Sequence, residues 1–424
     1  MSQVVNDTRA IPGPDTIHRT VLDNGLVTLV RPNQSAPIVV LQGSLPGGAA
    51  LEAADLAGLA SFTTSMLSRG SAAYDFAAFN ETVEAVGGNV TFGADTHTIE
   101  FGVTCLAEDF PTLAAVLADA LRRPTFPAEQ VGRVRQQRLV SLQERDEDTA
   151  SVANLRFFEG IFGRAHPYGR STSGYIETIS GLPREQIVDF HTRTFTPNGA
   201  ALAITGAVAR DAAVDLVAQL FGDWRGPALP SAPAVALPLP AAPQRAVLPG
   251  KVQADIVIGA RAVPRHHPDF YALRVANCIL GQFGLMGRLG AVVREELGLA
   301  YYAYSSLMVD KEDGVWQAAA GVNPEHVDQA IAAMEAEFAR LAAEPVDAAE
   351  LADSQAYLTG VMPLTLETNE GVASALLNME WFGLGLDYLW RYRDLIEAVT
   401  PADVQRVART YLAPARLVTV VAGP

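Results

Sequence analysis

The stretch LPREQIVDFHTRTFTPNGAALAITG at residues 182–206 and the stretch TPADVQRVARTYLAPARLVTVVAG at residues 400–423 share one pattern. Each has a proline, a segment of helix length, a second proline and an apolar run that ends in glycine. The prolines are 14 residues apart in the first stretch and 13 in the second, and the glycine follows the second proline by 9 residues in both. Proline favours the first helical turn and the positions just after a helix, and the apolar run is typical of a buried strand. The repeat therefore predicts two α+β domains of one fold.

A proline-rich segment separates the two repeats. Seven prolines stand between Pro227 and Pro249. Because proline lacks a backbone donor and favours extended conformations, this segment is expected to be a semi-rigid linker. The predicted organisation is an N-terminal domain over residues 1–226, a linker over 227–249 and a C-terminal domain over 250–424. Each domain is expected to have a mainly antiparallel sheet packed against helices.

Hydrophobic periodicity locates the main elements within each domain. Predicted strands cover Val21–Pro32, Ile38–Leu45, Asn89–Glu100, Phe101–Leu106, Ala254–Ala262, Ala303–Val309 and Val315–Val322. Predicted helices cover Leu56–Ser68, Phe76–Val86, Phe110–Leu121, Ala128–Glu144, His326–Leu341, Ala348–Leu358 and Ala373–Phe382.

Composition excludes several classes of protein. The 424 residues are 49% hydrophobic and 18% charged, and the formal net charge is −16. Such acidity argues against binding to nucleic acid or to anionic lipid. No run of about 18 apolar residues predicts a membrane span. Met1–Gly25 has neither an apolar core nor an Arg-rich, acid-poor composition, so we expect no targeting segment and a cytoplasmic location.

Residue types alone give no catalytic centre. No two of the seven histidines are four positions apart, so no helix presents a His pair to a metal, and two cysteines are too few for a cysteine-rich zinc site. The glycines of Gly281–Gly287 are not followed by the Lys-Ser/Thr pair of a phosphate-binding loop.

Several motifs nevertheless resemble one family in order along the chain. Ala57–Leu67, AGLASFTTSML, resembles the helix G-L-A-H-F-x-E-H-M-L of the pitrilysin/insulinase family of inverzincin zinc peptidases. Further similar motifs are Gly87-Gly88-Asn89, Ala165–Arg170 (AHPYGR), Gly281–Gly287 and Arg294–Tyr301 (REELGLAY). The resemblance covers nearly the whole chain and implies the two-domain fold of that family.

The sequence departs from the family at the zinc motif. The positions of the two zinc-binding histidines and the general-base glutamate are Ser61, Ser65 and Thr64, which share one helical face. Hydroxyl groups are poor zinc ligands, and none acts as a base near neutral pH. The third ligand of the family is expected near position 142, where the chain has Leu142, with Glu144 two residues on. We therefore expect no metal in this chain and no activity when it is alone.

The second-half motif is retained. The resemblance implies that Arg294 and Tyr301 bind the substrate and the oxyanion that forms during hydrolysis. A guanidinium offers a fork of donors, and a phenol offers one more. The alternative is that Arg294 caps a helix end and Tyr301 packs in a core.

The chain lacks the zinc motif of the first half and retains the Arg294 and Tyr301 motif of the second half. In this it resembles the zinc-less partner in heterodimeric processing-type peptidases of bacteria. The resemblance implies a non-catalytic subunit that binds an unfolded peptide as an added strand, with the edge segment Asn89–Asp95 or its counterpart in the partner as the expected place. It supplies Arg294 and Tyr301 to a homologous subunit that carries H-x-x-E-H and holds the zinc. The alternative is a non-proteolytic scaffold subunit of the same fold. A stand-alone peptidase would need a His pair on one helix, which is absent.

Overall fold

The chain forms two compact units, each assembled from three stretches of sequence. The structure, a computed structural model, describes residues 11–230, 235–282 and 284–424. Residues 1–10 of the predicted first domain and 231–234 of the predicted linker lie outside the described residues. Unit 1 comprises residues 1–142, 171–235 and 364–390, and unit 2 comprises residues 143–170, 236–363 and 391–424. Each unit thus contains a segment from the other half of the sequence.

Unit 1 is built on a six-stranded sheet with the strand order β1-β2-β6-β3-β5-β4. All neighbouring strands are antiparallel except the parallel pair β2 and β6. The bounds are β1 (His18–Val21), β2 (Val27–Pro32), β3 (Ile38–Pro46), β4 (Asn89–Ala94), β5 (Thr98–Leu106) and β6 (Ala201–Gly206).

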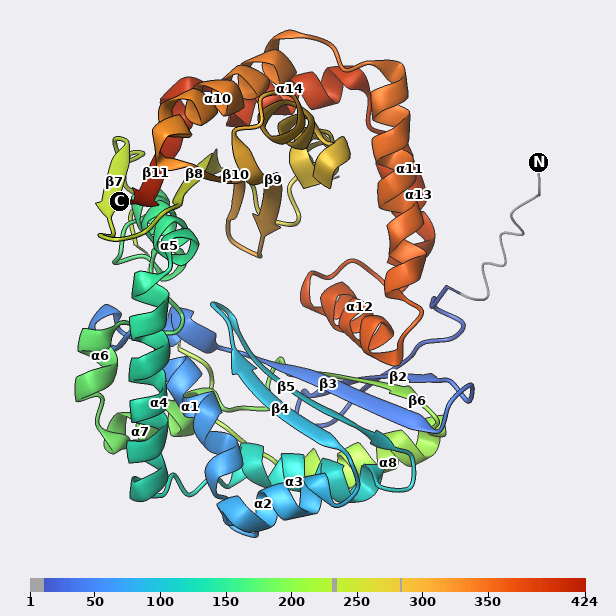
Figure 1. Cartoon of the computed structure of the whole chain (residues 1–424). Coiled ribbons are helices and arrows are strands. Elements are labelled where there is room, and N and C mark those ends of the chain that lie inside the picture. Colours follow the sequence, from blue (N-terminus) through green and yellow to red (C-terminus); the bar gives the residue numbers. More distant parts are fainter. Residues whose placement is uncertain (1–10, 231–234, 283) are drawn as a thin grey trace. The chain divides into compact units, whose positions relative to one another are not determined.

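Helices cover both faces of this sheet (Figure 1). One face packs against helices of the first half, α3 (Phe110–Arg122) on β5 and α8 (Arg210–Phe221) on β2. The other face receives α12 (Asn369–Trp381), which packs on β3 and β6 although it belongs to the second half. The remaining helices are α1 (Leu59–Met66), α2 (Phe76–Glu84), α4 (Ala128–Glu147), α6 (Ile176–Gly181) and α7 (Arg184–Thr194).

Polar contacts fix α12 at its place on the sheet. Thr205 Oγ1 of β6 donates to the Asn369 carbonyl at 2.7 Å, and Ser374 Oγ donates to Gln42 Oε1 at 2.8 Å. These bonds join the start and the middle of α12 to two central strands, so the helix is held in one register on the sheet.

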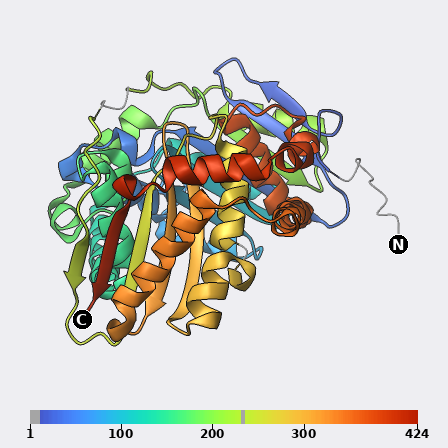
Figure 2. The same ribbon diagram turned by 90° about the horizontal axis from the view of Figure 1, so that it is seen from above.

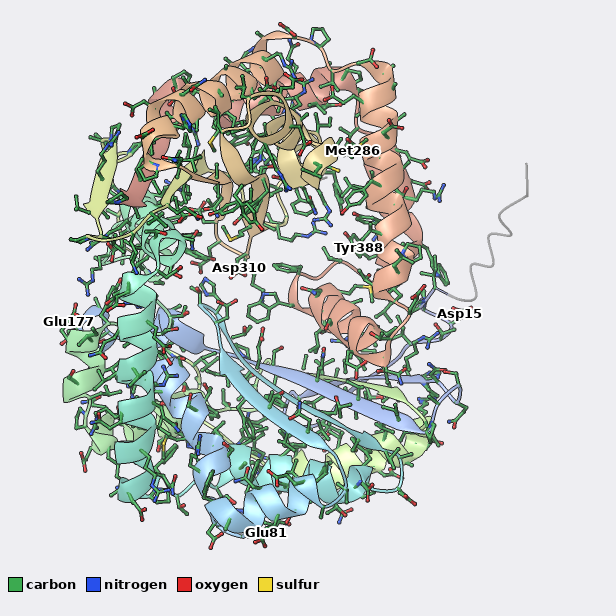
Figure 3. All side chains as sticks on the ribbon, in the orientation of Figure 1. Asp15, Glu81, Glu177, Met286, Asp310 and Tyr388 are labelled. Carbon is green, nitrogen blue, oxygen red and sulfur yellow. The ribbon has the colours of Figure 1, made fainter. Side chains whose placement is uncertain are left out.

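Unit 2 has a five-stranded sheet with the order β7-β11-β8-β10-β9. Only β7 and β11 are parallel neighbours. The β9–β10 hairpin turns at Asp310, which is labelled in Figure 3. The bounds are β7 (Gln244–Val247), β8 (Ala254–Arg261), β9 (Ala300–Val309), β10 (Gly314–Val322) and β11 (Val418–Gly423).

The sheet of unit 2 is also covered on both faces. Helices α9, α10 and α14 form one layer, seen in gold, orange and red in front of the strands in Figure 2. Helix α5 of the first half packs on β8 and β11, where Phe157 and Ile161 join a core with Val257 and Val420. The bounds are α5 (Thr149–Phe162), α9 (Phe270–Asn277), α10 (Val327–Ala343), α11 (Ala348–Thr365), α13 (Tyr388–Glu397) and α14 (Pro401–Tyr411).

The predicted α+β class with two mainly antiparallel sheets is confirmed. Both repeats form the expected helix and strand, α7 with β6 and α14 with β11. The boundary predicted at residue 100 is wrong. The Asp95 backbone N–H donates to the Thr98 carbonyl across a tight turn, and β5 begins at Thr98. Part of the predicted linker, Gln244–Val247, is strand β7. No helix among the described residues combines the length and the apolar composition that crossing a membrane requires.

Candidate functional site

Helix α1, which carries the degenerate zinc motif, is held at its N-terminus by a buried carboxylate. Glu52 is 3% exposed and accepts the backbone N–H of Gly58 at 3.0 Å and of Ala60 at 2.9 Å. An anion at this end of a helix binds donors that have no partner within the helix. Gly58 has φ 93°, and a Cβ there would lie 2.8 Å from Gly174 Cα. The sequence therefore fixes where α1 begins.

Two hydroxyls of the degenerate motif, those of Thr64 and Ser65, donate to the backbone of α1 itself. Thr64 Oγ1 donates to the Ser61 carbonyl at 3.0 Å, and Ser65 Oγ donates to the same carbonyl at 2.9 Å. Thr64 is buried, and Ser61 and Ser65 are half-buried. A threonine hydroxyl offers no proton acceptor of useful basicity, so Thr64 does not fit the role of a general base.

An arginine from α4 lies against the same face. Arg138 Nη2 donates to Ser61 Oγ at 2.6 Å and to Ser65 Oγ at 2.9 Å, and its guanidinium carbon is 5.5 Å from the centroid of the Phe62 ring. Ser65 thus donates to the helix and accepts from the guanidinium, and Ser61 accepts from the guanidinium. The Arg138 side chain is therefore hydrogen-bonded to both positions at which the resemblance implies zinc-binding histidines.

Sequence analysis did not identify Arg138. The resemblance directed attention to position 142, and Arg138 precedes it by four residues, which is one turn on the same face of a helix. That spacing, applied to a predicted helix over Ala128–Glu144, is the signal that could have found it.

The charge of Arg138 does not fit a zinc ion at this place. Burial lowers the pKa of Arg138 to about 10, against the opposing effect of the nearby Glu52 carboxylate, so the guanidinium stays charged at neutral pH. Leu142 is buried and apolar, and Glu144 is exposed. The part of the chain that the structure describes contains no group of three His, Cys, Asp or Glu side chains arranged to hold a metal. Two neutral hydroxyls beside a cation do not fit zinc.

Tyr301 and Arg294 lie on the surface of unit 2. Tyr301 is on β9 and is 82% exposed, so the interpretation that it packs in a core is wrong. Arg294 is on the short π-helix Gly290–Glu296, its side chain is 42% exposed, and it lies 3.5 Å from a carboxylate oxygen of the adjacent Glu295. That ion pair is with a sequence neighbour and not with a helix terminus. Both side chains are therefore accessible to a ligand.

The next tyrosine along β9 has the opposite environment. Tyr302 donates its hydroxyl proton to Asp255, which is 1% exposed. Asp255 also accepts from Thr149 Oγ1 at 2.5 Å and from Gln253 Nε2 at 3.1 Å. Burial and the carboxylate raise the pKa of Tyr302 far above its usual value. Tyr302 thus anchors the start of α5, whereas Tyr301 faces outward.

The glycine-rich stretch Gly281–Gly287 is not a phosphate-binding loop in the structure. A π-helix covers Cys278–Gln282 and a short 3-10 helix covers Gly284–Met286, while residue 283 lies outside the described residues. Met286, labelled in Figure 3, is 75% exposed. An exposed apolar side chain of this kind does not bind phosphate.

The edge strand expected to receive a peptide is present. β4 (Asn89–Ala94) pairs with β5 and ends the order of strands in the sheet of unit 1. It also contacts α1, the helix of Ser61 and Ser65. Unpaired backbone groups of an edge strand can bond to an added strand.

Comparisons with known proteins identify the family of the chain. Residues 28–173 match the family described as insulinase (peptidase family M16), and residues 181–358 match the peptidase M16 inactive domain. An uncharacterized zinc protease of Mycobacterium tuberculosis is 30% identical over 96% of this chain and 93% of its own. A probable mitochondrial-processing peptidase subunit beta of Schizosaccharomyces pombe is 23% identical over 95% of this chain and 89% of its own.

A solved structure shares the fold. The peptidase M16 inactive domain from Pseudomonas fluorescens superposes with a TM-score of 0.89 at 23% identity, over 96% of this chain and 98% of that one. Family matches in both halves, together with the Mycobacterium relative, show that the chain belongs to the insulinase (M16) family of peptidases.

Proposed function

We propose that this chain is the non-catalytic subunit of a heterodimeric zinc endopeptidase. In this proposal it binds an unfolded peptide and supplies Arg294 and Tyr301 to the zinc site of a homologous partner that carries H-x-x-E-H. The observation that carries the proposal is the contrast between two places in the chain. Exposed donors remain at Arg294 and Tyr301, whereas Ser61, Thr64 and Ser65 offer no metal ligands.

The chemistry of the two exposed side chains suits a peptide carbonyl. A guanidinium offers parallel N–H donors, and the Tyr301 phenol offers one O–H. Donors placed where negative charge develops on a carbonyl oxygen stabilise the transition state of hydrolysis. The zinc is supplied by the partner in this proposal, because no residue of this chain that the structure describes forms a set of ligands for it.

The edge strand β4 (Asn89–Ala94) is the proposed place for the peptide, with the partner's corresponding strand as the other candidate. Main-chain bonds would bind an extended peptide with little regard for its sequence, and side-chain pockets would add specificity. The Schizosaccharomyces pombe relative is named a subunit, which supports a role in a complex.

Co-expression with a homologous chain that carries H-x-x-E-H tests the proposal. We expect the two chains to co-elute, the complex to contain zinc and to cleave an unfolded peptide, and this chain alone to do neither. Co-elution without cleavage would favour the scaffold function. Stoichiometric zinc and peptidase activity in this chain alone would overturn the proposal.

A further inference from the structure

We propose that Arg138, Ser61 and Ser65 form a carboxylate-binding site, in which the guanidinium of Arg138 takes the place of a metal ion. The ligand is a carboxylate of the bound peptide, either its C-terminus or an acidic side chain. The inference rests on the proposed function in one respect, that this chain binds peptides.

The hydrogen bonds of Arg138 leave donors for a ligand. Nη2 donates to both Ser61 Oγ and Ser65 Oγ, which are neutral groups. Nη1 has no acceptor among the described residues and is not fully buried, and Nε is buried without an acceptor. Arginine carries five N–H donors, and buried donors normally have partners. The guanidinium is therefore oriented by two hydroxyls while part of its bonding capacity remains available.

The charge of Arg138 is also incompletely balanced. Glu52 is the carboxylate whose charge acts on Arg138, but its two oxygens accept the backbone N–H groups of Gly58 and Ala60. No ion pair joins Arg138 to a carboxylate of the described residues. A partly desolvated cation without a hydrogen-bonded anion is unfavourable, and a planar guanidinium binds carboxylate with two parallel bonds.

The place of the site favours a peptide as the source of the carboxylate. Ser61 and Ser65 lie on α1, which contacts the edge strand β4. A peptide added to β4 would run beside α1, so one of its carboxylates could reach the guanidinium without a change of fold. The half-buried hydroxyls leave this face of α1 accessible.

Binding of three labelled peptides to the full-length chain tests the inference. The peptides have one neutral extended sequence and end in a free carboxylate, in an amide, or in an amide with one internal glutamate. Fluorescence anisotropy would give each dissociation constant. We expect at least one carboxylate peptide to bind about tenfold or more tightly than the neutral amide, as a charge-assisted bond of about 1.5–3 kcal/mol would produce. Which of the two binds tightly identifies the source of the carboxylate.

Variants of α4 provide the controls. Arg138→Ala should remove the preference for the carboxylate and leave binding of the amide unchanged, and Arg138→Lys should retain only part of the preference. Arg133→Ala, which removes an exposed arginine of the same helix, should change neither. If Arg138→Ala does not fold, the Ser61→Ala/Ser65→Ala variant removes both acceptors that orient the guanidinium and should also weaken the preference.

The possible outcomes separate the two proposals. Equal binding of all three peptides by the wild-type chain, or an undiminished preference in a folded Arg138→Ala variant, would overturn the carboxylate site while leaving peptide binding intact. Absence of binding for every peptide would overturn the peptide-binding part of the proposed function and the carboxylate site with it.

Discussion

Arg138 and Ser61 are 77 positions apart in the sequence, and 2.6 Å separates Nη2 of the first from Oγ of the second. The bond joins α4 to α1 at the place where the resemblance implies a divalent cation. The guanidinium of Arg138 therefore occupies the place where the resemblance implies zinc. Ser61 and Ser65, which stand where the family has zinc-binding histidines, accept hydrogen bonds from it.

This arrangement predicts that restoring the zinc motif alone will not restore zinc binding. The variant Ser61→His/Thr64→Glu/Ser65→His/Leu142→Glu should bind zinc weakly while Arg138 is present, because the guanidinium repels the ion at short range. Adding Arg138→Ala should increase zinc affinity on the order of a hundredfold, since two like charges a few ångströms apart repel by several kcal/mol. Isothermal titration with zinc measures the difference. Equal affinities in the two variants would show that Arg138 does not control access of the metal.

Tyr301 and Arg294 are predicted to act in the complex with the proposed partner. Loss of one donor to a developing oxyanion typically lowers kcat by about 10²–10³, so Tyr301→Phe and Arg294→Ala should each have an effect of this size. Arg294→Lys should restore only part of the rate because an ammonium lacks the planar fork. Tyr304→Phe is the matched control, since Tyr304 lies on the same strand and is 43% exposed. Unchanged kcat in assembled complexes would refute the catalytic role.

The two adjacent tyrosines of β9 are predicted to differ in their effects on stability. Tyr302→Phe removes a hydrogen bond to the buried Asp255 carboxylate and should lower the free energy of unfolding by about 1.5–3 kcal/mol. Tyr301→Phe should change it by less than about 0.5 kcal/mol, as is usual for exposed positions. Urea unfolding of both variants provides the comparison. Similar losses in the two variants would mean that the Asp255 bond contributes little.

Gly58 is predicted to be required for the start of α1. Gly58→Ala should lower the free energy of unfolding by about 2 kcal/mol or more, because φ is 93° and the added Cβ would meet the Gly174 backbone at 2.8 Å. Gly132→Ala in α4 is the control, since a Cβ there meets no atom within 4 Å. That variant should be about 0.5–1 kcal/mol more stable than wild type. Thermal unfolding of the two variants should therefore shift in opposite directions.

Local pattern predicted the elements well and their packing poorly. The repeated prolines located α7 with β6 and α14 with β11, because helix starts and buried strands depend on nearby residues. Helix α5 was not predicted, and no local signal assigns α5 to the sheet of unit 2 or α12 to that of unit 1. An apolar helix face indicates that a partner exists, but the partner is determined by contacts that are distant in sequence.

At the site, too, local pattern identified some residues and only the three-dimensional packing identified another. The motif spacing directed attention to Ser61, Thr64 and Ser65, whereas Arg138 was found only when α4 was placed against α1. A departure from a family pattern records which residues are missing and does not indicate what has replaced them. The replacement became visible through the geometry of α1 and α4, which are separated in sequence by helix α2, the strand pair β4–β5 and helix α3.

The exchange of helices between the two units has a consequence for synthesis on the ribosome. When β6 is complete at Gly206, the sheet of unit 1 has all its strands, but α12 begins only at Asn369. The face formed by β3 and β6 must therefore remain uncovered while about 160 further residues are added, which takes on the order of 10–30 s at typical elongation rates. During that interval Val40 and Ala203, which are buried in the finished molecule, remain uncovered, and Gln42 and Thr205 lack their bonds to α12. The yield of the chain in cells should consequently depend on chaperones that bind nascent chains, although the finished molecule has this face covered by α12.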